Sequence, residues 1–247
     1  MDTLSHTRAE TRTEPRYHVA PMKRVPARHY GAGEILFHAH ERVTGLHLID
    51  EGQVKLVVQT ASGHERILAV LGAGDAAGAA SLQAATYGAD AVAITPVAAS
   101  YIPRDEFFRR SKTEPELASA YAEGLARDLQ HAWRQLAQAY TPVRARLAAT
   151  LLDLAIRFGV GTGRRSLHTR LSHDDLAAMI GANRVSVSTA MADLRRVGAV
   201  VGARGRYFLD LSRLACATGE AGADADSRRS DFEDGVTVAR YRDMMVG

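Results

Sequence analysis

Cysteine, lysine and long apolar runs are all scarce in this chain. One cysteine, Cys216, occurs among 247 residues, which excludes an internal disulfide, a thiolate zinc site and a cysteine-ligated iron–sulfur cluster. No stretch approaches the ~20 apolar residues of a membrane span, and the charges spread through residues 1–22 do not fit a signal peptide. The composition predicts a cytoplasmic protein with no membrane partner, no metal and no cofactor.

The positive charge is concentrated in one segment. Residues 141–216 contain twelve arginines against five acidic residues, a net charge of +7, whereas residues 1–140 carry −1 and residues 217–247 carry −3. Only three of the 31 basic residues are lysine, so an arginine-rich coding bias is an alternative explanation. Such a bias would not deplete acidic residues in the same window. The local charge favours a polyphosphate partner.

The first half of the chain has the pattern of an antiparallel β-structure. Residues 1–22 are polar and contain two prolines, which is typical of a flexible arm. From Gly33 onward, short β-rich runs are separated by Gly, Asp or Ser turn signals, and several alternate apolar with polar residues. This pattern predicts a β-roll or sandwich over residues 23–112. The expected strands are Ile35–Phe37, Leu46–Ile49, Val54–Gln59, Arg66–Leu71, Ala91–Ile94 and Ala98–Ile102.

Residues 113–140 carry a heptad pattern that predicts a long helix. Thr113 is the expected N-cap, and Pro115 falls in the first turn. Apolar residues recur at alternating spacings of three and four over three heptads, which favours a parallel dimerisation helix over a helix packed only on its own roll. The positions of this seam include Ala118, Ala122, Leu125, Leu129, Ala132 and Leu136.

Residues 171–197 have the signals of a helix-turn-helix. Ser172 followed by Asp175 resembles a capping box, with Asp in place of the usual Glu or Gln, and opens a short helix. Gly181 can adopt the positive φ of a tight turn, and Asn183 is the expected cap of a second helix. Two short helices joined by a glycine turn predict a helix-turn-helix. The alternative is a helical hairpin that binds no nucleic acid.

The flanking residues extend this unit to a winged helix over residues 141–216. Thr141 and Pro142 predict the cap and first position of a preceding helix, which ends at Gly159. After the second helix, two short apolar runs flank a turn that contains Arg204 and Arg206, which predicts a β-hairpin wing. Residues 217–247 are rich in Ala, Gly, Asp and Arg, and we expect a disordered tail there.

These segments together resemble the cyclic AMP receptor protein / FNR family of bacterial transcription regulators over residues 24–215. In the roll, the resemblance rests on Gly33–Phe37, Leu46–Leu56 and Arg66–Gly78. The resemblance implies an α+β fold: a jelly-roll-like β-roll of the cyclic-nucleotide-binding type, a dimerisation helix and a C-terminal winged helix-turn-helix. It also implies a homodimeric regulator that binds double-stranded DNA at a palindromic site and contacts RNA polymerase.

The nucleotide-binding motif of the family is degenerate here. In members that bind cyclic nucleotides, a Glu follows the glycine equivalent to Gly78, and an Arg-Ser pair further along holds the phosphate. This chain has Ala79 at the first position and Ala89 and Asp90 at the pair. Because Asp90 would repel a phosphodiester, we expect no binding of cyclic AMP through the usual contacts. The small-molecule effector is thus unknown or absent.

The DNA-reading helix also departs from the family pattern. Arg184 matches the family arginine that contacts guanine, whereas Val185 replaces a Glu and Thr189 replaces an Arg. Val185 cannot accept a hydrogen bond from cytosine but can contact a thymine methyl. We therefore expect an altered half-site. The positions expected to contact phosphates are Ser172, Asn183, Ser186, Arg204 and Arg206.

Other functions are less well supported by the sequence. The N-terminal cysteine cluster of the FNR branch is missing, and His38, His40 and His47, the nearest haem-ligand candidates, have spacings more typical of surface residues. Ser172–Asp174 contain the residue types of a hydrolytic triad but cannot form a relay as neighbours on a helix. We expect no enzyme. The alternative function is a ligand-sensing dimeric module whose C-terminal domain mainly makes protein contacts.

Overall fold

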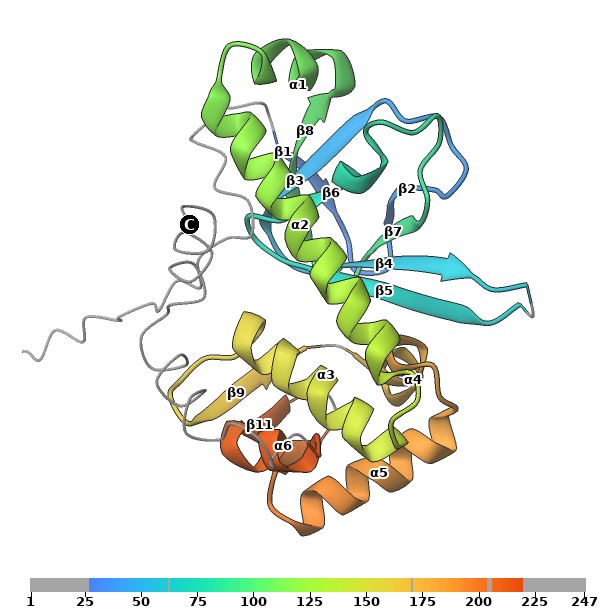
Figure 1. Cartoon of the computed structure of the whole chain (residues 1–247), viewed down its shortest axis with the longest axis vertical. Helices are drawn as coiled ribbons and strands as arrows, with labels where there is room; N and C mark the ends of the chain where they lie inside the picture. Colours follow the sequence, from blue (N-terminus) through green and yellow to red (C-terminus); the bar gives the residue numbers. More distant parts are fainter. Residues whose placement is uncertain (1–26, 62, 170, 204–205, 220–247) are drawn as a thin grey trace, which may run out of the picture.

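The computed structural model describes residues 27–61, 63–169, 171–203 and 206–219. These residues form a β-roll, a long helix that crosses it and a smaller C-terminal α+β unit (Figure 1). The α+β class predicted from the sequence is confirmed. The expected arm over residues 1–22, the wing residue Arg204 and almost all of the expected tail lie outside the described residues.

Two four-stranded antiparallel sheets build the roll. Their strand orders are β1-β8-β3-β6 and β2-β7-β4-β5, and a short 3₁₀ turn, η1 (Ala79–Ser81), follows β6. All six expected strands form, and β1 and β6 were not predicted. The strands are β1 (Ala27–Tyr30), β2 (Ile35–Phe37), β3 (Gly45–Glu51), β4 (Val54–Gln59), β5 (Glu65–Leu71), β6 (Ala76–Ala77), β7 (Asp90–Ala93) and β8 (Val97–Pro103).

Two helices follow the roll, α1 (Arg104–Ser111) and α2 (Pro115–Gln138). The predicted Thr113 cap is wrong, because the Thr113 hydroxyl donates to the Arg110 carbonyl at the end of α1 and Glu114 is the residue before α2. One face of the first half of α2 packs on the roll. Its contacting residues are Leu117 and Tyr121, and the Tyr121 hydroxyl donates to the Ala79 carbonyl at 3.0 Å.

The C-terminal unit is a winged helix. Its elements are α3 (Val143–Phe158), β9 (Arg164–His168), α4 (His173–Ile180), α5 (Arg184–Arg196), β10 (Val200–Ala203), β11 (Arg206–Asp210) and α6 (Leu211–Ala217). The predicted hairpin is part of a three-stranded sheet of order β10-β11-β9. Thr141 is not the cap of α3, because its hydroxyl donates to the Gln138 carbonyl and Pro142 takes that position.

A single hydrophobic core joins the C-terminal unit to one sheet of the roll. Ile67 and Val70 on β5 belong to the same buried cluster as Leu176 and Ile180 on α4. Each of these four side chains is at most 6% exposed. Helix α4 is therefore buried both against the roll and against its own domain.

His47 on β3 is buried in the other core without a polar partner. Its ring centroid lies 5.1 Å from that of Tyr101, 5.8 Å from Phe37 and 6.1 Å from Tyr30, and neither ring nitrogen has a hydrogen bond. Burial, with a smaller contribution from the charge of Arg28, lowers the pKa of His47 to about 4. The ring is neutral at pH 7 and takes the place of an aromatic side chain.

We expect the His47→Phe variant to lose less stability than the wild type as the pH is lowered. The pKa of His47 is about 4 in the folded state and ~6.5 in the unfolded state. The stability that the wild type gains from a neutral His47 is therefore fully present above pH ~6.5. The free energy of unfolding falls as the pH drops toward 4, by about 3 kcal/mol. Urea unfolding at several pH values measures this. His29→Phe, at an exposed strand position, is the matched control, and a variant curve parallel to wild type would contradict the assignment.

Candidate nucleic-acid interface

The helix-turn-helix begins with a complete capping box. The Ser172 hydroxyl accepts from the Asp175 N–H at 3.0 Å, and the Asp175 carboxylate accepts from the Ser172 N–H at 2.9 Å. Both reciprocal bonds satisfy amide donors that the first turn of α4 would otherwise leave unpaired. The predicted start of this helix is confirmed.

The turn and the second helix also form as predicted. Gly181 ends α4 with a left-handed φ of 62°, which a residue with a side chain adopts at a cost. Asn183 Oδ1 then accepts from the Ser186 N–H at 2.8 Å and caps α5. A further contact joins α4 to α5, because His173 Nδ1 lies 2.9 Å from Ser188 Oγ. Sequence periodicity gave no sign of this contact.

The outer face of α5 presents the three residues expected to read bases. Val185 is 74% exposed, and Arg184 and Thr189 are also exposed. Arg184 Nη1 donates to Asp174 Oδ2 at 3.0 Å, while the Thr189 hydroxyl donates to the Val185 carbonyl within the helix. The opposite face, with Val187 and Leu194, is fully buried.

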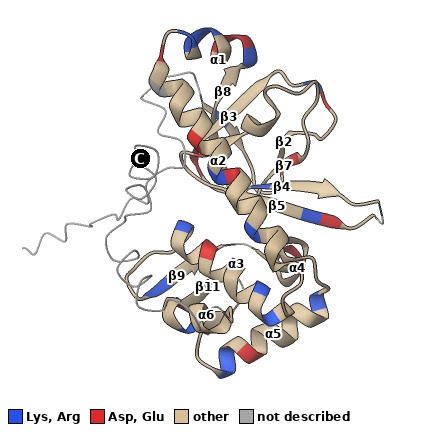
Figure 2. Cartoon of the chain, viewed as in Figure 1, with Lys and Arg blue, Asp and Glu red and all other residues tan. Residues whose placement is uncertain are grey.

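The residues expected to contact phosphates surround this face. Ser172 and Asn183 are exposed at the starts of α4 and α5, Ser186 is half-buried in the first turn of α5, and Arg206 is exposed at the start of β11. Arginines also lie along α5, α3 and β9 (Figure 2). The outer face of α5 is thus exposed, with hydroxyl, amide and arginine side chains beside it, an arrangement that a major groove can accept.

The degenerate nucleotide motif lies in the roll beside a buried aromatic pair. Ala79 is 1% exposed and Tyr87 is 2% exposed. Tyr87 stacks on Phe37 with ring centroids 4.0 Å apart, and its hydroxyl donates to the Gly45 carbonyl at 2.8 Å. A Cβ at Gly78 would meet the rings of both Tyr87 and Phe37.

Asp90 has a structural role at the edge of this motif. Its Oδ1 accepts from the Ala39 N–H at 2.8 Å and lies 3.4 Å from His38 Nδ1. The neighbouring Ala89 is buried and offers no cation. The Asp90 carboxylate is thus bound to the β2–β3 loop.

The second half of α2 exposes a broad apolar face. Leu129 is 50% exposed, Trp133 59% and Leu136 68%. Within the predicted seam, Ala122 and Ala132 are also exposed, but Ala118 and Leu125 are half-buried. Trp133 was missed by the heptad analysis because it lies one position beyond Ala132. In Figure 1 this half of α2 extends past the roll toward the C-terminal unit.

Comparisons with known proteins agree with this architecture. The model of the cyclic nucleotide-binding domain family matches residues 27–113, and that of the Crp-like helix-turn-helix domain matches residues 145–217. A CRP-like cAMP-activated global transcriptional regulator of Mycobacterium tuberculosis is 31% identical over 189 residues, which cover 75% of this chain and 84% of the relative. The chain belongs to the CRP/FNR family of transcription regulators.

Other relatives share the same organisation. The global nitrogen regulator of Synechococcus elongatus is 32% identical, with 66% of this chain and 76% of the relative covered. Among solved structures, TTHB099, a CRP family regulator of Thermus thermophilus, has a TM-score of 0.65 at 26% identity over 78% of this chain and 96% of that one. FixK2 of Bradyrhizobium japonicum has a TM-score of 0.68 at 22% identity, over 77% and 96%, and shows the fold alone.

Membership in the CRP/FNR family makes this chain a DNA-binding transcription regulator and not an enzyme. Across the described ranges, no group of three or more His, Cys, Asp or Glu side chains is arranged to hold a metal ion. None of the helices in those ranges is long and apolar enough to span a bilayer.

Two ion pairs connect the DNA-binding domain of this CRP-like regulator to its roll. Lys55 Nζ on β4 lies 2.7 Å from Asp175 Oδ1 on α4, and Arg157 Nη2 on α3 lies 2.9 Å from Asp75 Oδ2. Burial acts to raise the pKa of Asp175, but hydrogen bonds from Lys55 and Ser172 outweigh it and hold that pKa below its usual value. The residue that caps the first helix of the DNA-binding motif is thereby also bonded to the roll.

Proposed function

We propose that this chain is a homodimeric, cytoplasmic transcription regulator that binds a palindromic DNA site and acts with RNA polymerase. The observation that carries the proposal is the capped, outward-facing helix α5, whose Arg184, Val185 and Thr189 are exposed over a buried inner face. Two such helices related by a two-fold axis enter successive major grooves about 34 Å apart.

Arg184 is the principal base-reading residue in this proposal. Its guanidinium has a fork geometry that matches guanine O6 and N7, and its pair with Asp174 joins two exposed side chains, which DNA can replace at little cost. Val185 packs on a thymine methyl at the next step. Ser172, Asn183, Ser186, Arg204 and Arg206 set the register through phosphates.

The exposed face of α2 supports the homodimer. Leu129, Trp133 and Leu136 are each at least half exposed on α2, and neighbouring exposed apolar side chains of this kind are typical of a protein contact. Pairing this face with the same face of a second copy buries the three side chains in a coiled-coil seam. The resulting two-fold symmetry matches that of a palindrome.

The residues at the family's nucleotide-binding positions support regulation without cyclic AMP in the roll. Position 79 offers no carboxylate and position 89 no cation, and the Asp90 carboxylate is bound to the Ala39 N–H. A phosphodiester placed there would approach a negative charge with no arginine at position 89 to hold it, which opposes binding. Activity is then set by the amount of the protein or by a ligand elsewhere.

We expect Arg184→Ala to lose tenfold to a hundredfold in affinity for the selected site and to relax the preference at one base pair, because a bidentate arginine–guanine contact contributes about 1–3 kcal/mol. Selection from a random DNA library followed by gel-shift titration measures both effects. Arg109→Ala, an exposed arginine on α1 of the roll, is the control. Wild-type affinity in the Arg184 variant would refute the assigned reader, and failure to enrich any DNA would favour protein contacts as the role of this domain.

A calorimetric titration with cyclic AMP is expected to show no saturable binding up to millimolar concentration. The physical reason is the absence of a cation at Ala89 and of an acceptor at Ala79, together with the negative charge of Asp90. The M. tuberculosis relative, described as cAMP-activated, serves as the positive control under the same conditions. Micromolar affinity for this chain would contradict the prediction.

Trp133→Glu is expected to shift the protein from dimer to monomer. A charge placed in the centre of an apolar helix pair is buried without a partner on association. Sedimentation equilibrium over a range of protein concentrations gives the dissociation constant, and we expect at least a hundredfold increase. Val160 is 65% exposed and lies outside α2, so Val160→Glu should leave the dimer unchanged. A dimeric Trp133 variant would place the interface elsewhere.

A further inference from the structure

His173 lies on the first turn of α4, next to the residue that caps that helix. It directly follows Ser172, one of the residues proposed to contact a phosphate. Its ring is half-buried, and Nδ1 lies 2.9 Å from Ser188 Oγ on α5. Within the part of the chain that the structure describes, Nε2 of the ring has no hydrogen-bond partner. The contact with Ser188 therefore orients the ring and leaves Nε2 for another partner.

Three charged side chains act on this ring. Arg184 and Arg195 act on it from α5, and Asp174 is its neighbour on α4. Burial, followed by the charges of Arg195 and Arg184, lowers the pKa of His173, and the charge of Asp174 opposes this shift. In the absence of DNA the ring is therefore mostly neutral at pH 7.

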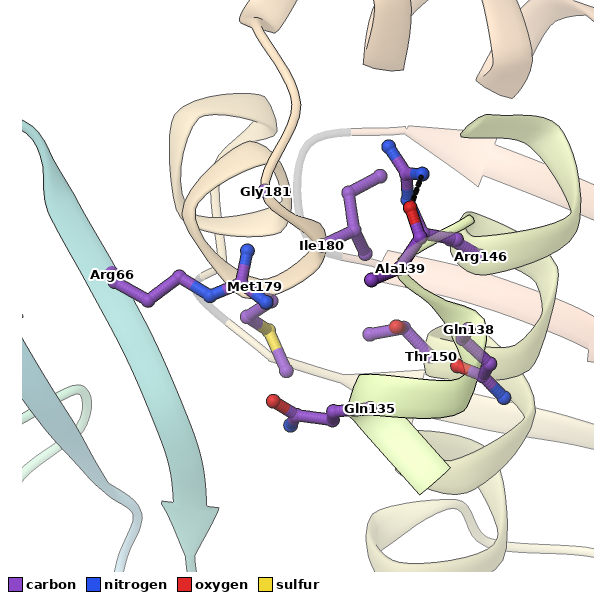
Figure 3. Close-up of a pocket in the computed structure, with 9 residues that line it drawn as sticks. All are labelled: Arg66, Gln135, Gln138, Ala139, Arg146, Thr150, Met179, Ile180 and Gly181. Carbon is purple, nitrogen blue, oxygen red and sulfur yellow. Dashed lines mark hydrogen bonds between the residues drawn. The ribbon is translucent and has the colours of Figure 1, made fainter. Parts of the chain in front are cut away.

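The cations that the roll places near α4 lie away from this ring. Lys55 on β4 is bonded to Asp175 at 2.7 Å, and side chains two residues apart on a helix do not face each other. Arg66 extends from β5 toward Gly181 (Figure 3), which is at the opposite end of α4, ~12 Å along the helix axis from His173. The protonation of the ring thus depends on the charges at the start of α4 and on α5.

Base reading by Arg184 would remove the partner of Asp174. Arg184 Nη1 donates to Asp174 Oδ2 at 3.0 Å in the absence of DNA, and the proposed contact with guanine takes the guanidinium away from that carboxylate. The Asp174 side chain, 63% exposed, then remains beside the DNA backbone, whose negative charge repels it. A proton on His173 offsets this negative charge.

A phosphate at the start of α4 acts on the ring in the same direction. The first helix of a helix-turn-helix crosses the DNA backbone, so a phosphate bound at Ser172 lies close to the following residue. An opposite charge nearby favours the charged form of a titratable group. The imidazolium has a donor on each nitrogen, so Nδ1 can donate to Ser188 while Nε2 donates to the phosphate.

We propose that His173 is a further DNA-contacting residue, which takes up one proton from solvent per protomer on binding and donates from Nε2 to a backbone phosphate. This inference rests on the proposed DNA-binding function, since it assigns a residue and a pH dependence to that same surface. The pKa of the ring is lower in the free protein than in the complex. The DNA affinity therefore rises as the pH falls between these two values and is constant above the higher one.

The test is a fluorescence anisotropy titration of the full chain with its selected DNA site, at constant ionic strength. Wild type is expected to bind about tenfold more tightly at pH ~6 than at pH ~8, because each proton taken up changes the affinity by up to tenfold per pH unit. His173→Asn keeps a hydrogen-bonding group for Ser188 but cannot titrate, so it should lose most of this pH dependence. His29→Asn, at an exposed position on β1 of the roll, is the matched control and should behave as wild type does.

A second variant, His173→Arg, carries a permanent positive charge. It is expected to bind DNA with little dependence on pH and, at pH ~8, more tightly than wild type does. A purely structural role of the ring predicts a different result, since losing the contact with Ser188 would weaken binding equally at both pH values. A pH-independent affinity of wild type, or a full pH dependence in His173→Asn, overturns the proposal. Thermal unfolding of each variant checks that it is folded.

Proton uptake can also be measured directly. Calorimetric titrations with DNA in two buffers of different ionisation enthalpy count the protons bound, and His173→Asn should take up fewer than wild type. If DNA is bound through Arg184 and both proteins take up the same number of protons, the DNA-binding function stands and the role of His173 fails. If no DNA sequence is enriched from the random library, the proposed function itself fails.

Discussion

The packing of helix α4 against strand β5 is the contact on which the arrangement of the whole chain depends. It merges the core of the DNA-binding domain with one sheet of the roll, and two ion pairs, Lys55–Asp175 and Arg157–Asp75, flank it. Both pairs are largely shielded from solvent, so loss of one partner would leave a charge uncompensated. Apolar burial supplies the affinity of this contact, and the ion pairs select one relative position of the two domains.

Local signals in the sequence were sufficient for the DNA-binding motif. A cap acts within three residues, so Ser172, Asp175, Gly181 and Asn183 carried enough information to define both helices. The same reasoning failed at Thr113 and Thr141, because each hydroxyl bonds back to the helix that precedes it. Competition between the end of one helix and the start of the next depends on the angle of the chain at the junction, which residue type alone does not specify.

Contacts between residues far apart in the chain could not be predicted. Lys55 and Asp175 are 120 positions apart, and Arg66 meets Gly181 only after both domains have folded and docked. Strand β9 was missed because Arg164–His168 contains a single apolar residue, Leu167, and its partner strand β11 lies far along the chain. The nucleotide motif lies between these cases. The missing Glu and Arg were evident from the sequence, but the stacking of Tyr87 on Phe37 and the bond from the Ala39 N–H to Asp90 were not.

The structure places the two ends of the helix-turn-helix under different constraints. The start of α4 is bonded to the roll through Asp175, and the turn at Gly181 is covered by Arg66, whereas the outer face of α5 is free of the roll. Both constraints act close to the turn that sets the direction of α5, so the docking of α4 on the roll also fixes where the exposed face of α5 points.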